Sequence, residues 1–211
     1  MMTFTPNGLA TALGSFPHTD VHAVCRLVLD YFPDIPVWPQ LPRLHFRENM
    51  YVQFTQGLPC LVIDEEREKI FFDTDQDITP ALEAFYERII ADDVDYFALT
   101  PEYAAGFFAM TDHLPAIPAG DGFVKGHVTG PVSLGLTITD ETRRASLYND
   151  LLADALTKTC VMKARWQIRQ LKSLRSHVII FIDEPYLASF GSAYVSLNRE
   201  SVVTMLNEVV E

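Results

Sequence analysis

The sequence lacks the features that mark several large classes of protein. No apolar run approaches the roughly 20 residues that a membrane-spanning helix needs, and residues 1–7 have neither the basic start nor the apolar core of a secretory signal. Cys25, Cys60 and Cys160 lie far apart and form no CxxC or CxH pair, so no disulfide framework or complete zinc site is visible. No GxGxxG or Walker motif marks a nucleotide-binding turn. We therefore expect a protein of the reducing cytoplasm.

Positive charge is also scarce. The 211 residues include 16 Lys and Arg against 28 Asp and Glu, which gives a net charge of −12. An acidic excess of this size argues against nucleic acid or an anionic membrane as a partner. With 48% hydrophobic and 21% charged residues, the composition is typical of globular proteins, and we expect one domain over residues 1–211.

Strand and helix patterns alternate along the chain. The predicted strands of the main sheet are residues 9–16, 37–38, 96–99, 122–129 and 177–182. The predicted helices are residues 21–32, 46–54, 79–91, 103–110, 140–173 and 198–209. Alternation of this kind implies a parallel sheet with helices outside it. A hairpin of two short strands within residues 58–72 is predicted as an excursion from this sheet.

The predicted fold is α/β, of the (β/α)8 TIM-barrel type, with about five of the eight strand–helix units present. A barrel is favoured over an open doubly wound sheet because several strand ends carry polar or glycine-rich turns, which places them around one site. Thr19 or Asp20, Thr79 and Asp140 are the predicted caps of three of the helices.

The segment from His177 to Pro185 carries the clearest functional signal. Residues 178–182 are apolar throughout, as expected for a strand buried on both faces, and Asp183 and Glu184 follow at once. Barrel active sites lie at such strand ends, and carboxylates there are costly to desolvate, so they usually bind something. Gly14-Ser15 and Thr129-Gly130-Pro131 end two other strands, and we predict that the three turns share one site.

Each candidate residue also has a structural alternative. Asp183 and Glu184 could cap the next turn or pair with Arg43 or Arg47. Gly14-Ser15 could be a tight turn before Pro17. A histidine within a strand, such as His127, is commonly a neutral core residue, and Gln40 lies in a proline-rich segment.

Three segments resemble motifs of one enzyme family. Residues 11–18 (TALGSFPH) resemble the first-strand motif of the catalytic barrel of cobalamin-independent methionine synthase. Residues 126–133 (GHVTGPVS) resemble its glycine–proline turn, and residues 182–185 (IDEP) its Ile-Asp-Glu-Pro strand. Their order and approximate spacing agree across nearly the whole chain. Together they are typical of the superfamily that joins this enzyme to uroporphyrinogen decarboxylase and the corrinoid-linked methyltransferases.

The resemblance implies methyl transfer to a thiol such as homocysteine. In the family, the first-strand Gly-Ser backbone and hydroxyl hold the substrate carboxylate, and the Asp of Asp-Glu-Pro holds its amino group. By resemblance these roles fall on Gly14, Ser15 and Asp183. The family's second acidic residue for the amine corresponds to Gln40, which carries no charge; residues 47–50 then resemble the helix that follows.

The candidate substrate-binding residues are completed by two neighbours of these motifs, Glu184 and His127. No catalytic residue and no metal ligand is assigned. Two alternatives to the methyltransferase stay open. One is a decarboxylase-like lyase of the same superfamily, which would need clustered arginines for an anionic substrate. The other is a non-catalytic half-barrel that only binds a ligand.

The resemblance also implies zinc. The family's ligands, a His-x-Cys pair and later Glu and Cys, follow the Asp-Glu-Pro strand, and we expect them beyond Glu211. Zinc coordination deprotonates a thiol whose pKa is otherwise about 8.5. Gly14, Ser15 and Asp183 would therefore bind a substrate without activating it. A barrel without its later strands leaves an unpaired apolar edge at residues 178–182, which predicts self-association.

Overall fold

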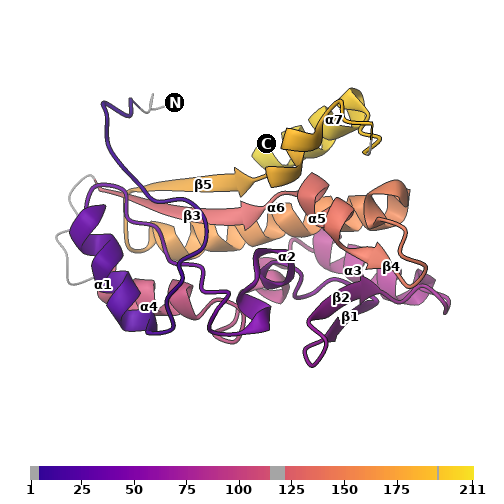
Figure 1. Cartoon of the computed structure of the whole chain (residues 1–211), viewed down its shortest axis with the longest axis horizontal. Coiled ribbons are helices and arrows are strands. Elements are labelled where there is room, and N and C mark those ends of the chain that lie inside the picture. The colour runs from indigo at the N-terminus through magenta and orange to yellow at the C-terminus, as the bar shows by residue number, and fades with distance from the viewer. Residues whose placement is uncertain (1–4, 115–121, 194) are drawn as a thin grey trace.

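The computed structural model describes residues 5–114, 122–193 and 195–211. This part of the chain is mixed α/β, with seven α-helices and two small sheets (Figure 1). The α-helices are α1 Val21–Tyr31, α2 Met50–Gln53, α3 Thr79–Ile90, α4 Ala105–His113, α5 Pro131–Thr137, α6 Asp150–Lys172 and α7 Arg199–Val210. The strands are β1 Leu61–Asp64, β2 Lys69–Phe72, β3 Phe123–Thr129, β4 Thr139–Asp140 and β5 His177–Asp183. None of the described helices combines the length and hydropathy needed to cross a membrane.

The parallel pair β3 and β5 is the centre of the fold, and both strands were predicted. They run in register from Phe123 opposite His177 to Thr129 opposite Asp183. The long helix α6 lies along one face of this pair (Figure 1). Gly126 faces α6, because a Cβ placed there would meet side chains of that helix. Since side chains alternate along a strand, the residues on either side of Gly126 point to the opposite face.

Two extended segments continue the pair without forming full strands. Val37 pairs with Lys125 and Ser15 pairs with Gln40, each through a single parallel bridge. The order across this parallel array is therefore residues 11–15, residues 37–40, β3 and β5. The predicted strand at residues 9–16 is wrong, since only the single bridge at Ser15 forms. Gly14 has a φ of +86°, which lies outside the range of β-strands.

The side chain of Gln167, from α6, fills the opening between residues 37–40 and β3. Its Oε1 accepts hydrogen bonds from the Trp38 indole (2.9 Å) and from the His127 backbone N–H (3.3 Å). Its Nε2 donates to the His127 carbonyl (2.9 Å). Gln167 is fully buried. Its side chain provides hydrogen-bond partners for the His127 N–H and carbonyl groups, which do not pair with a strand on this side. One amide thus joins α6, β3 and the second segment of the array.

The hairpin of β1 and β2 forms as predicted, and β4, which was not predicted, pairs in parallel with β2. Asp140, in β4, is not the cap of the long helix. Its carboxylate accepts hydrogen bonds from the backbone N–H groups of Thr142 and Arg144 and closes a tight turn. The helix α6 begins only at Asp150, where Asn149 caps it.

Two short 3-10 helices and two helix starts bear on other predictions. Residues 96–99, predicted as a strand, overlap the 3-10 helix Val94–Phe97, because the Asp93 side chain caps a helical turn there. Thr79 lies inside α3, and the residue before it offers no side-chain cap. Asp20 caps α1 as predicted. The predicted helix at 46–54 is divided into a 3-10 turn and the short α2. The remaining 3-10 helices are Phe46–Glu48, Ser146–Tyr148 and Pro185–Ser189.

The predicted burial of the last strand on both faces is wrong. Every residue of β5 is at least partly exposed, and Phe181 is 39% exposed. Alternate apolar residues of β5 pack against the core around Trp38 and Phe107. Phe181 and Asp183 point to the other side. Of the described strands, only β3 pairs with β5, so its second edge has no strand partner within this part of the chain.

A close contact between α4 and the second segment provides a test of the packing. A Cβ placed on Gly106 would lie 1.9 Å from the Pro39 carbonyl oxygen. Gly→Ala within a helix ordinarily stabilises by about 0.5–1 kcal/mol. Here we expect Gly106→Ala to lower the free energy of unfolding by about 1–3 kcal/mol, because the helix must move off Pro39. Chemical denaturation measures this change, and a more stable variant would contradict it.

Candidate functional site

The parallel array brings the ends of its members to one edge. Ser15 and Gln40 are paired there, with the Ser15 hydroxyl 2.9 Å from Gln40 Oε1. Thr129 and Asp183 lie opposite each other at the ends of β3 and β5. Ligands of parallel α/β folds bind at this kind of edge, outside the carboxyl ends of the strands. We refer to it as the carboxyl edge.

A chain of buried polar groups leads inward from Ser15. Gln40 Nε2 donates to Gln53 Oε1 (2.8 Å), and Gln53 Nε2 donates both to Glu48 Oε2 (3.1 Å) and to the Tyr103 carbonyl (2.6 Å). Gln40, Gln53 and Glu48 are each at most 3% exposed. We call this chain the glutamine relay. The oxygen and the nitrogen of the Gln40 side-chain amide both have protein hydrogen-bond partners, Ser15 and Gln53.

Glu48, at the inner end of the relay, is a buried carboxylate that the sequence prediction missed. Its oxygens accept backbone N–H groups from Ala105 (2.6 Å) and Leu41 (3.4 Å). Burial raises the pKa of Glu48 to about 7, and these hydrogen bonds oppose the rise. The likeness of residues 47–50 to a family helix marked the segment but gave no reason to single out this side chain.

Lys125 and Asp183 place opposite charges on the open side of β3 and β5. Lys125 is 3% exposed, and its Nζ donates to the Ala12 carbonyl (2.6 Å) and lies 4.8 Å from the centre of the Phe181 ring. Burial lowers the pKa of Lys125 and raises that of Asp183, and each charge opposes the shift of the other. The sequence prediction missed Lys125, although a lysine within an otherwise apolar strand was the available signal.

Glu184 points away from Asp183 and holds the start of α5. Its two carboxylate oxygens accept the backbone N–H groups of Val132 (2.9 Å) and Ser133 (2.7 Å). Burial raises its pKa, and these hydrogen bonds oppose the rise. A Cβ on Gly130 would lie 2.3 Å from Glu184 Oε1, which explains the glycine in the turn. Glu184 thus caps α5, which precedes it in the chain, and gives no side-chain cap to the 3-10 turn that follows it.

His127 lies within an aromatic cluster of the core. Its ring stacks on Trp38 with 3.9 Å between the centroids, and Phe54 meets it edge-on. Burial lowers the pKa of His127 to about 3, and the charge on Lys125 adds to this shift. Its Nε2 is sealed from solvent and has no hydrogen-bond partner in the described part of the chain. The ring is thus neutral near pH 7 and packs within the core.

The described residues do not fit the zinc ion that the resemblance implies. Within residues 5–114, 122–193 and 195–211, no three His, Cys, Asp or Glu side chains form a group that could hold a metal. Cys25 and Cys160 are buried beside backbone carbonyl groups. Burial raises the pKa of Cys25 to about 12 and raises that of Cys160 as well.

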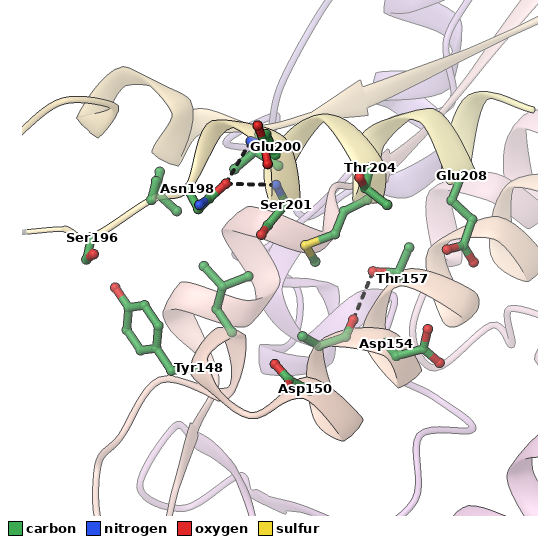
Figure 2. Close-up of a pocket in the computed structure, with 15 residues that line it drawn as sticks. Tyr148, Asp150, Asp154, Thr157, Ser196, Asn198, Glu200, Ser201, Thr204 and Glu208 are labelled. Atoms are coloured by element: carbon green, nitrogen blue, oxygen red, sulfur yellow. Dashed lines mark hydrogen bonds between the residues drawn. The ribbon is translucent and has the colours of Figure 1, made fainter.

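A groove of about 440 Å³ lies elsewhere, between α6 and α7 (Figure 2). Asp150, Asp154, Glu200 and Glu208 line it, and Lys158 of α6 forms an ion pair with Glu208. Its walls include none of the residues predicted for the site, so the groove and the carboxyl edge are built from different side chains.

Three comparisons with known proteins, against family models, curated proteins and solved structures, found no match for this chain. The likeness to the methionine synthase family therefore rests on the three sequence motifs. In the structure, each of these three segments contributes one residue to the carboxyl edge: Ser15, Thr129 and Asp183.

Glu48 should make stability depend on pH in a defined direction. Its pKa rises from 4.5 to about 7 on folding, so the folded chain holds this proton more tightly than the unfolded chain. The resulting stabilisation is complete below pH 4.5 and is lost as the pH rises through about 7. Glu48→Gln should remove a decline of about 3 kcal/mol across this window, measured as the difference between wild type and variant in denaturant titrations.

The matched control for this measurement is Glu83→Gln, which changes an exposed glutamate of α3. Its pH profile should run parallel to that of the wild type. A parallel profile for Glu48→Gln would show that Glu48 does not carry the pH dependence.

Proposed function

We propose that this chain is a methyltransferase-like protein of the cobalamin-independent methionine synthase type, built on a barrel-type α/β fold. Its ligand would be a small thiol such as homocysteine, bound at the carboxyl edge. The observation that carries the proposal is the order of the parallel array. Residues 11–15, residues 37–40, β3 and β5 lie side by side in sequence order, as successive barrel strands would.

The charges at the carboxyl edge suit an amino-acid thiol. Asp183 can form a charge-assisted hydrogen bond with an ammonium group, and Lys125 offers a cation on the same side of the strands for a carboxylate. Gly14, with its positive φ, turns the chain at Ser15 and leaves the backbone there exposed. The same geometry supports binding and orientation of the thiol. Activation of the thiol is not assigned to the described residues, since they do not fit zinc.

The alternative lyase has less support. It would need several cationic side chains gathered near the strand ends. Arg47 instead forms ion pairs with Glu65 and Glu102 at the surface, and Arg43 is exposed. Lys125 is the buried cation that the parallel array provides. A non-catalytic binding protein would use the same site, and it would differ only by the absence of turnover.

Asp183→Ala should weaken the binding of homocysteine about tenfold or more, because the substrate ammonium loses its charged acceptor. Isothermal titration calorimetry with the full chain measures this change. Glu200→Ala, in the groove between α6 and α7, is the control and should leave the affinity unchanged. Equal affinity of wild type and Asp183→Ala would reject this site.

A second copy of the chain is the partner that we propose for β5. This seven-residue strand has one edge without a described partner, and Phe181 is exposed beside it. An apolar strand with an unpaired edge is a template for further pairing. Light scattering should detect association that increases with concentration. Phe181→Ser should weaken it, whereas Tyr31→Ser, at an exposed aromatic residue on α1, should not. A wild-type monomer at every concentration would contradict this proposal.

A further inference from the structure

The hydrogen bonds of the glutamine relay all run from donor to acceptor in one sense, and the groups at its inner end determine that sense. Gln53 lies beside two groups that accept hydrogen bonds, the Tyr103 carbonyl and the Glu48 carboxylate. Both Glu48 oxygens already accept backbone N–H groups, from Ala105 and Leu41. The Tyr103 carbonyl can only accept a hydrogen bond, so the NH2 group of Gln53 must point to it, since the reverse orientation would place two oxygens 2.6 Å apart.

The orientation of Gln53 in turn determines the orientation of the Gln40 amide. With the Gln53 NH2 group turned inward, its Oε1 faces Gln40 and can only accept, so Gln40 must present its own NH2 group there. Gln40 Oε1 is then left facing Ser15. The Ser15 hydroxyl has one hydrogen, and it donates that hydrogen to Gln40 Oε1 over 2.9 Å.

We infer that the relay makes the Ser15 hydroxyl a hydrogen-bond acceptor toward any ligand, so that the group seated against it is a donor such as an ammonium. Ser15 is exposed, whereas the three other members of the relay are buried. Only its oxygen lone pairs are therefore available at the carboxyl edge. This inference refines the proposed function, because the resemblance alone would give the same hydroxyl a carboxylate to hold.

The opposite arrangement, in which the Ser15 hydroxyl donates to a ligand, would cost free energy. For Ser15 to donate to a carboxylate, it would have to abandon Gln40 Oε1, which is buried and has no other donor recorded in the described part of the chain. Buried acceptors without a donor are rare in proteins, because they lose the hydrogen bonds that water would give. A carboxylate in this part of the site would instead use backbone N–H groups or Lys125.

The test uses simple probes that separate the two charges. Methylammonium and acetate are each titrated into the full 15N-labelled chain, and the backbone signals of residues 14–16 are followed by NMR. We expect methylammonium to shift these signals, with the response lost in Ser15→Ala and retained in Ser15→Thr, which keeps the hydroxyl. The acetate response should be the same in all three proteins. Loss of the acetate response in Ser15→Ala, or the absence of any methylammonium response in the wild type, would overturn the inference.

A second set of probes links the inference to the thiol ligand. Calorimetry compares homocysteine with 3-mercaptopropylamine, which lacks the carboxylate, and 4-mercaptobutanoate, which lacks the amine. Ser15→Ala should weaken the two amines about tenfold and the mercaptobutanoate less than twofold. If no thiol binds to the wild type while methylammonium shifts residues 14–16, the proposed function fails and the polarity of Ser15 stands.

Discussion

The side chain of Gln167 is the contact on which the parallel array depends. Residues 37–40 and β3 share only one bridge, at Val37 and Lys125, which is too little pairing to hold two segments in register. Gln167 supplies the remaining hydrogen bonds from the long helix, and the Trp38 ring stacks over His127 beside it. Without this amide, the backbone N–H and carbonyl groups of His127 that face residues 37–40 would be buried without partners.

Local signals account for the elements that the sequence predicted well. The apolar runs of β3 and β5, the charged turn of the β1–β2 hairpin and the capping Asp20 of α1 each lie within a few residues of the structure that they specify. One error arose where two local signals competed. Asp140 and Asn149 can both cap a helix, and only the pairing of β4 with β2 decides that Asp140 belongs to a turn.

The site was predicted less completely than the fold, for a physical reason. Ser15, Gln40 and Asp183 could be found because they belong to motifs at strand ends. Glu48 and Lys125 were missed, because their importance depends on partners that are distant in the sequence. Glu48 is satisfied by the start of α4 and Lys125 by a carbonyl in the first segment. Burial of a charged group is a property of the folded chain, and a single sequence gives little warning of it.

The two adjacent carboxylates at the end of β5 have different surroundings. Asp183 faces the open side, while Glu184 is fixed to the first turn of α5 through two backbone N–H groups, in a space that Gly130 leaves free. Two hydrogen bonds thus anchor the residue next to Asp183 to another element of the fold. Under the proposed function, a ligand at Asp183 would meet a strand end that is already anchored, so less of the entropic cost of association would come from ordering the protein.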